Sequence, residues 1–296
     1  MKQNPEIDSL AFADDLTIFS DSMEAAERQI NEFNVQAHKT GLQISFQKNE
    51  VIMNINSPPR ELAVGQGKIK RVEKFKYLGE WITATLSEKE VFISRMNKMK
   101  MAFHLFKNIY NKRSVSFNEK LRHYCSAIRP EVLCTSECLA MNKNGLIEKL
   151  EAKERKTLRK ILGPIKENGE YRRHHNHELC SHIEKITDTI QKRRIVFHGH
   201  MTRMSPGIVI NCMITYFQER KTKWAWFTEV EKGVKEMGII RDDILEHISL
   251  KEKLMVWQGL QEKSKMKTGK AWTRRGRSNT EKKSCEQTSE HVMQDS

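Results

Sequence analysis

Cysteine is scarce in this sequence, with six residues among 296 at irregular spacings. Small secreted domains held by disulfides are shorter and much denser in cysteine. The scarcity therefore excludes a disulfide scaffold, and we expect reduced thiols, as in proteins of the cytoplasm or nucleus.

Long apolar runs are also missing. No stretch approaches the ~20 consecutive apolar residues that a membrane helix needs. The first five residues, Met1–Pro5, hold no apolar core of a signal peptide. We therefore expect an intracellular protein of the nucleus or cytoplasm, neither secreted nor bound to a membrane.

Acidic residues are outnumbered by basic ones. There are 52 lysines and arginines against 38 aspartates and glutamates, which gives a net charge of +14. A chain this basic attracts polyanions, and nucleic acid is the commonest polyanion inside a cell. The alternative is a soluble protein that is basic for other reasons. The hydrophobic fraction of 38% is lean but sufficient for a packed core.

The first third of the chain mixes strand and helix patterns. Short apolar runs on both sides of Asp14-Asp15 predict a strand, a tight turn and a returning strand. Apolar residues at helical spacing then predict a helix that ends at Gly41. They are Met23, Ala26, Ile30, Phe33 and Ala37. Further strands are expected at Leu42–Phe46, Val51–Ile55, 62–64 and 69–82.

After Ser87 the pattern becomes helical. One stripe has spacings of three and four, through Phe92, Met96, Met99, Phe103, Phe106 and Tyr110. Ser116 and Glu119 form the pattern of a capping box, which begins a second helix that runs to about 129. Further helices are expected at 145–162, 181–198 and 227–260.

These patterns predict an α+β fold with a division near residue 85. We expect a partial palm of antiparallel strands and one helix at 1–85, a helical thumb at 86–165 and a helical C-terminal region at 166–260. Residues 261–296 are basic with few apolar anchors, and we expect this tail to be disordered.

Asp14-Asp15 is the most specific local signal. Nucleotidyl transfer needs two divalent ions roughly 3.5–4 Å apart, and carboxylate oxygens suit Mg²⁺. Adjacent carboxylates on a turn between strands can supply such ligands. The same pair also occurs on ordinary surface turns, so the context must decide between the two interpretations.

The context resembles reverse transcriptases. Phe12-Ala13-Asp14-Asp15 resembles the F/Y-x-D-D box of that family. Gly41–Lys48, which reads GLQISFQK, looks like the G-L-x-I-N-x-x-K motif, with Ser45 in place of the usual Asn. Phe75–Gly79, which reads FKYLG, looks like the primer-grip segment F-x-Y-L-G. Three boxes in this order are far more specific than one.

The resemblance continues to about residue 230 and is closest to the non-LTR, LINE-type retrotransposons. The matching segments are Ile128-Arg129-Pro130 with Ser136-Glu137, Leu158–Gly163, Tyr171–Leu179 and Arg193–Met204. Several aromatic positions of these motifs hold Cys134, Tyr171 and Cys180, which departs from the family pattern.

The resemblance implies a role for each matched residue. Asp14 and Asp15 would be catalytic ligands of Mg²⁺, and Lys48 would lie near the leaving pyrophosphate. Phe12 would lie beneath the incoming nucleotide or the primer end, and Tyr77-Leu78-Gly79 would position the primer. The partners implied are an RNA template, a DNA primer and, in an active enzyme, a dNTP.

Basic residues of the expected helices are candidates for phosphate contacts. They are Lys98, Lys107, Arg113, Arg155 and Arg159. A solvated basic face is the alternative for each of them. The cysteines and histidines lack the paired spacing of a zinc finger, so no zinc is expected.

Two expected parts of the family have no match here. The first metal-binding Asp lies on a strand well upstream of the Asp-Asp box, and only eleven residues precede Phe12. The fingers are unmatched too. We therefore expect this chain to be inactive alone, with the missing N-terminal half of the polymerase as a possible partner. The alternatives are a non-enzymatic nucleic-acid-binding remnant and a pseudogene product.

Overall fold

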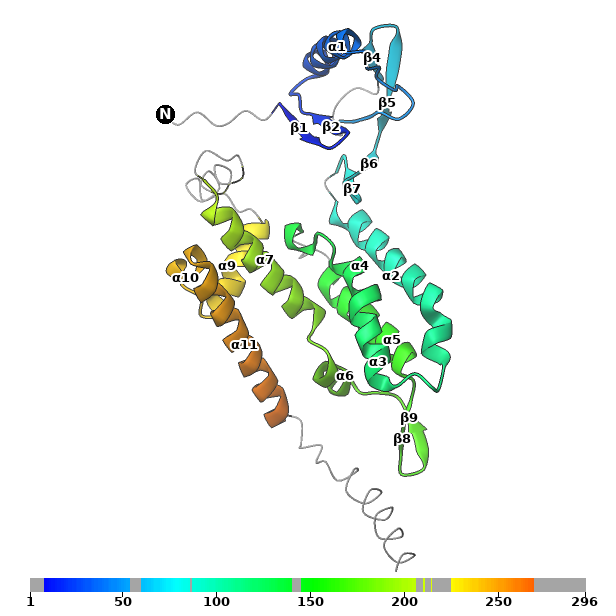
Figure 1. Ribbon diagram of the computed structural model, residues 1–296, viewed down its shortest axis with the longest axis vertical. Coiled ribbons are helices and arrows are strands. Elements are labelled where there is room, and N and C mark those ends of the chain that lie inside the picture. The colour runs from blue at the N-terminus through cyan, green and yellow to red at the C-terminus, as the bar shows by residue number, and fades with distance from the viewer. Residues whose placement is uncertain are drawn as a thin grey trace, which may run out of the picture.

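The computed structural model describes residues 8–53, 60–85, 87–139, 145–205, 210, 214 and 225–268, and the side chains among them up to residue 258. Small sheets and one helix at the N-terminal end are followed by a longer array of helices (Figure 1). The predicted α+β class is confirmed. Residues 261–268 of the expected tail continue the last helix, α11 (His247–Thr268), and the tail from residue 269 onward lies outside the described residues. The boundary near 85 stays a prediction.

The N-terminal unit contains helix α1 (Met23–Lys39) and strands in two sheets. Strands β1 (Ser9–Phe12) and β2 (Asp15–Ile18) form an antiparallel hairpin, while β3 (Glu50–Ile52), β5 (Gly67–Val72) and β4 (Leu62–Val64) form a second sheet in that order. Helix α1 places the predicted residues Met23, Ala26 and Ile30 against Leu62, Val64 and Ile69 of the second sheet.

The caps of α1 explain its length. The Ser22 side chain accepts a hydrogen bond from the Ala25 N–H at 3.1 Å, which makes Ser22 the N-cap. At the other end Gly41 has φ +80°, and the N–H of Leu42 donates to Ala37 O. A glycine in the left-handed backbone conformation is a common way for a right-handed helix to end.

Two expectations for this unit are wrong. Leu42–Phe46 forms no strand, although Ile44 and Phe46 pack against the sheet. The alternation there reflects burial without strand pairing. Strand β3 also runs parallel to β5, with Val51 opposite Arg71, whereas antiparallel strands were expected. Parallel neighbours need a long connection between them, and residues 53–66 supply it.

A second hairpin lies between the N-terminal unit and the helices (Figure 1). Strands β6 (Lys74–Tyr77) and β7 (Glu80–Thr83) pair antiparallel, and the turn between them is Leu78-Gly79. Helix α2 (Glu88–Asn111) follows, with Ser87 as its N-cap. Because β7 also contacts α2, the hairpin is attached to the helical part of the protein.

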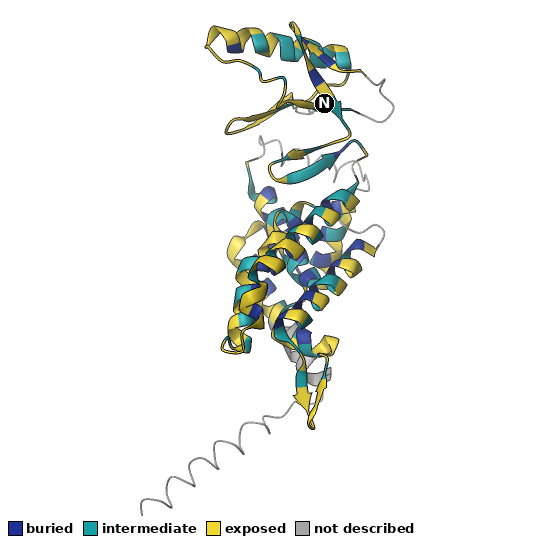
Figure 2. Ribbon diagram, turned by 90° about the vertical axis from the view of Figure 1, so that its right-hand side faces the viewer, coloured by how far each residue is buried: buried dark blue, intermediate teal, exposed yellow. Residues whose placement is uncertain are grey.

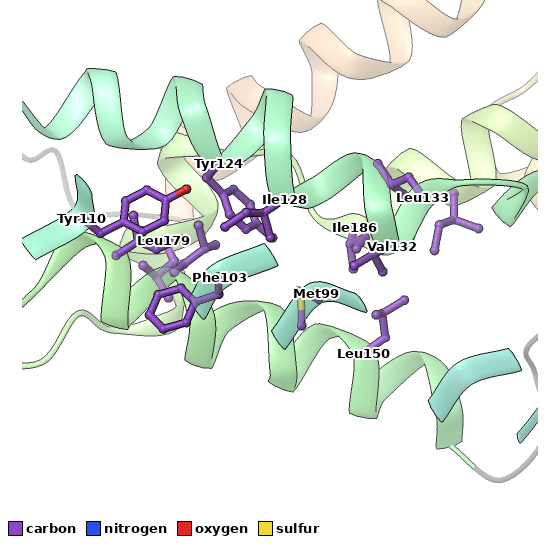
Figure 3. Packing of buried hydrophobic residues seen from close by; sticks show 13 residues of the cluster. Met99, Phe103, Tyr110, Tyr124, Ile128, Val132, Leu133, Leu150, Leu179 and Ile186 are labelled. Carbon is purple, nitrogen blue, oxygen red and sulfur yellow. The ribbon is translucent and has the colours of Figure 1, made fainter. Parts of the chain in front are cut away.

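The main core forms around α2. Helix α3 (Phe117–His123), a π-helical turn (Tyr124–Ile128) and α4 (Arg129–Leu133) pack on one side, and α5 (Leu146–Leu162) packs on another. Figure 3 shows Met99, Phe103 and Tyr110 of α2 directed at these neighbours. The predicted apolar stripe of α2 is thus core, and the predicted capping box of Ser116 and Glu119 is present.

The C-terminal helices differ from their predicted bounds. A short 3₁₀ turn (Ser136–Cys138) precedes α5, and a hairpin of β8 (Ile165–Glu167) and β9 (Glu170–Arg172) follows it. The helix expected at 181–198 is two helices, α6 (Asn176–His182) and α7 (Ile186–Arg203). The helix expected at 227–260 is three, α9 (Ala225–Glu236), α10 (Arg241–Leu245) and α11 (His247–Thr268).

Gly238 explains the break between α9 and α10. It has φ +64°, and the N–H of Ile239 returns to Val234 O at 3.0 Å, which ends α9. Burial is concentrated among the helices, while much of the N-terminal unit is exposed (Figure 2). Within the described residues, no helix combines the length and apolar character needed to cross a membrane.

Candidate functional site

The β1–β2 hairpin presents the predicted carboxylates at its tip. Phe12 and Asp15 face each other across the last rung of the ladder, and Ala13-Asp14 forms the two-residue turn. Ala13 has φ +52°, a left-handed conformation that suits a tight hairpin turn. Both aspartates and Phe12 are exposed. The hairpin therefore holds two adjacent carboxylates and one aromatic ring in a small exposed area.

Phe12 and Asp15 lie on the same face of the hairpin. Directly opposed residues of an antiparallel ladder project to one side, with Cβ atoms about 4.5–5.5 Å apart. Phe12 is 62% exposed, which leaves the ring available to a ligand. The structure thus brings together two of the residues that sequence analysis assigned to one site.

The donor chemistry of the hairpin suits Mg²⁺ only in part. Carboxylate oxygens are the ligands that Mg²⁺ prefers. Two carboxylate groups are present at the hairpin tip. Among the residues that the structure describes, no group of three Asp, Glu, His or Cys side chains could hold a metal. Asp14 and Asp15 are therefore candidate ligands that need further donors.

Lys48 lies apart from the hairpin in the chain, on the turn that follows Ser45. Its backbone N–H donates to Ser45 O at 3.1 Å, and its side chain is exposed. The position leaves the ammonium free to reach a phosphate. Its expected place near the leaving pyrophosphate stays a prediction.

The β6–β7 hairpin carries the second predicted group. Leu78 and Gly79 form its two-residue turn with φ +47° and +88°, and positive values at both positions are typical of a type I′ turn. Asparagine or glycine normally occupies the first position. Leucine there costs roughly 1–2 kcal/mol of backbone strain, and its side chain is 47% exposed. A strained, exposed apolar residue at a turn is a candidate contact for a ligand.

Helix α2 places basic residues beside this turn. The Lys98 ammonium donates to Gly79 O at 3.4 Å, which joins two of the predicted site residues. Lys107 and Arg113 are exposed farther along the same segment. From Val91 to Asn118 the chain holds six lysines and arginines and no acidic residue. The α2 segment is therefore a continuous source of positive charge.

The remaining two predicted phosphate ligands are engaged within the protein. The Arg155 guanidinium lies 3.0 Å from Glu151, and Arg159 donates to His174 O at 2.9 Å. Arg159 also donates to the Asn176 side chain. Both arginines are half-buried, so a bound phosphate would compete with these contacts. Their role in nucleic-acid binding stays a prediction.

Sequence analysis missed Arg95, the most deeply buried cation near the second hairpin. Its side chain is 2% exposed and lies 3.1 Å from Glu80 of β7. Burial lowers the pKa of Arg95, and the Glu80 carboxylate opposes this shift. Arg95 occupies the apolar stripe of α2, three residues after Phe92 and four before Met99. A charge on an apolar stripe was the signal that could have identified it.

Comparison with known proteins gives a family match for part of this chain. No curated protein and no solved structure matches it. A family model described as reverse transcriptase (RNA-dependent DNA polymerase) matches residues 1–82. That range contains the whole β1–β2 hairpin and nearly all of the β6–β7 hairpin. Residues 1–82 of this chain are therefore similar to the reverse transcriptase family, the RNA-dependent DNA polymerases.

Proposed function

We propose that this chain is part of the RNA-directed DNA polymerase of a non-LTR, LINE-type retrotransposon. The observation that carries the proposal is the position of Asp14 and Asp15, at an exposed hairpin tip inside the region similar to reverse transcriptases. The motifs after residue 85 support the non-LTR assignment, because they follow the order of that group along the remaining chain.

In this proposal the two carboxylates are ligands of catalytic Mg²⁺. A two-metal site activates the attacking hydroxyl and stabilises the leaving oxygen. Such a site takes carboxylates from more than one strand, and the β1–β2 hairpin supplies an adjacent pair from a single turn. We therefore propose that ligands from another segment or chain complete the site, and that this chain alone does not extend a primer.

The helical part acts in this proposal as the thumb, which holds the template–primer duplex. The α2 segment supports the assignment, because five basic residues between Val91 and Asn118 remain besides Arg95, which is paired with Glu80, and no acidic residue lies among them. Contacts to phosphates supply most of the affinity that does not depend on sequence. The RNA template and DNA primer would therefore lie along α2 and the Leu78-Gly79 turn.

Primer extension tests the catalytic part of the proposal. The full chain is incubated with a DNA primer on an RNA template, Mg²⁺ and dNTPs, alone and with a candidate N-terminal polymerase segment. We expect synthesis only in the complemented reaction, and none when Asp14→Asn and Asp15→Asn are combined. Synthesis by the complemented double variant would show that these carboxylates do not bind the catalytic metal.

A second candidate function is nucleic-acid binding without catalysis, and the basic α2 segment favours it. Binding of the primed template is measured as a function of salt. Lys107→Ala should lower the slope of log affinity against log salt by about 1, while Glu73→Ala serves as an exposed control. Binding that persists without any complemented synthesis would favour this function over the polymerase.

A further inference from the structure

Arg95 forms a buried junction between three elements. Its guanidinium donates to Val132 O of α4 at 2.9 Å, to the Glu80 carboxylate of β7 at 3.1 Å and to the Thr135 hydroxyl at 2.8 Å. The Thr135 hydroxyl in turn donates to the same Glu80 oxygen at 3.0 Å. A planar guanidinium suits this task because its donors diverge at fixed angles.

The junction lies directly beside the Leu78-Gly79 turn. Glu80 is the first residue of β7, immediately after Gly79, and it pairs with Tyr77 across the hairpin. Lys98, three residues after Arg95 and so on the same side of α2, donates to Gly79 O. Two cations of one helix therefore bind consecutive residues at the base of the turn.

The other side of the junction is fixed to the C-terminal helices. The backbone carbonyls of Leu133 and Leu139 accept hydrogen bonds from Arg193 and Arg194 of α7, at 2.7 Å and 2.6 Å. The Trp226 indole of α9 donates to Glu137 O. The segment that receives Arg95 is thus itself held by two further helices, so the hairpin is attached to a rigid support.

Stability alone does not account for a buried ion pair. Removing two charges from water costs as much as their attraction returns, and apolar residues of similar volume are often as stable. An ion pair with several hydrogen bonds does, however, allow only one relative orientation of the groups it joins. A junction of this kind would therefore act by setting the orientation of the hairpin.

We propose that Arg95 and Glu80 are positioning residues that fix the Leu78-Gly79 turn, so that it contacts one defined nucleotide of a bound primer. This inference rests on the proposed function, because it requires a primer at the turn. It adds the prediction that loss of the junction changes where the turn contacts the primer, with little effect on how tightly the nucleic acid binds.

The test is site-specific photocrosslinking in the full chain. Leu78 is replaced by p-benzoylphenylalanine. The side chain at this position is exposed, and the strain of a positive φ is already present with leucine. The primed template is bound and irradiated, and the crosslinked primer nucleotide is mapped. Glu80→Ala removes the ion pair from the hairpin side, Glu80→Gln keeps an oxygen acceptor for Arg95 and Thr135, and Glu73→Ala is the matched control at an exposed position.

We expect crosslinks at a single nucleotide in the parent, in Glu80→Gln and in the control. Glu80→Ala should spread them over about three or more nucleotides, since a site held by its supporting contacts loses precision without them. Affinity should change less than about twofold, because phosphate contacts elsewhere supply it. Because Glu80→Ala leaves the buried Arg95 without its carboxylate, it should lower the free energy of unfolding, so circular dichroism is used to show that each variant keeps its helices under the assay conditions.

Two failures are distinguishable. Crosslinks that stay at one nucleotide in Glu80→Ala, or that are absent or already spread in the parent while it binds the primed template, would overturn the positioning role and leave the proposed function intact. A parent chain that does not bind the primed template in a salt-dependent way would remove the proposed function itself.

Discussion

Glu154→Ala should strongly destabilise the helical part of the protein. Glu154 lies on α5 with 6% of its side chain exposed, and one carboxylate oxygen accepts two hydrogen bonds. The donors are the Tyr124 hydroxyl at 2.9 Å and Arg129 Nε at 3.0 Å. The substitution removes this shared acceptor from the π-helical turn and from α4 at the same time.

The expected loss follows from what the substitution leaves behind. Tyr124 is fully buried, and a buried hydroxyl without a partner costs about 1–3 kcal/mol. The Arg129 side chain is 10% exposed and would keep its charge, with Glu184 O as its remaining acceptor among the described residues. Breaking a buried pair from one side costs about 3–5 kcal/mol, which is a large share of a total of about 5–15 kcal/mol.

Urea unfolding followed by far-UV circular dichroism measures this loss. The double variant Glu154→Leu with Arg129→Met should recover part of the stability, because it removes both charges and retains the volume while the Tyr124 hydroxyl still lacks its acceptor. A loss below about 1 kcal/mol in Glu154→Ala, or a double variant no more stable than the single one, would refute the reasoning. The first result would mean that water reaches the pair, and the second that packing dominates.

Three further predictions concern single sites. Ser116→Ala should lower the free energy of unfolding by about 1 kcal/mol, measured by urea unfolding, because it removes the acceptor of the capping box. Leu78→Asn should raise stability by up to about 1 kcal/mol, because asparagine tolerates positive φ, and an unchanged or lower melting temperature would contradict this. Arg172 lowers the pKa of Glu178 to about 2 from its usual 4.5. The stability from this pair is therefore complete above pH 4.5 and lost as the pH falls towards 2, so the advantage of wild type over Glu178→Gln should shrink by about pH 3.

The helices and the first hairpin could be predicted from the sequence because their patterns are local. The spacing of Phe92, Met99 and Phe103 reports directly which face of α2 is buried. The short apolar runs on both sides of Asp14-Asp15 likewise predicted the β1–β2 hairpin. The Asn168-Gly169 turn of β8–β9 carried an equally local signal, a hairpin dipeptide, and the prediction lacked that hairpin.

Pairing between distant segments could not be predicted in the same way. The parallel register of Val51 with Arg71 depends on the path of the intervening chain, which apolar periodicity does not encode. The junction at Arg95 was missed because apolar periodicity does not show which charged residue has a buried partner. Glu154 and Arg194 are two further buried charges on apolar helix faces. Glu154 lies four residues after the core residue Leu150, and Arg194 lies four residues after Ile190. Partners that bury a charge are identified only in three dimensions.

The end of α4 and the residues up to Leu139 are held largely through their backbone. The carbonyls of Val132, Leu133 and Leu139 accept hydrogen bonds from arginines of α2 and α7, while Cys134 and Cys138 are exposed. A carbonyl is the same chemical group in every residue, so most side chains here can be exchanged without removing an acceptor. Mutational scanning should find this segment permissive except at Thr135 and Ser136, and should find its three arginines intolerant even of lysine.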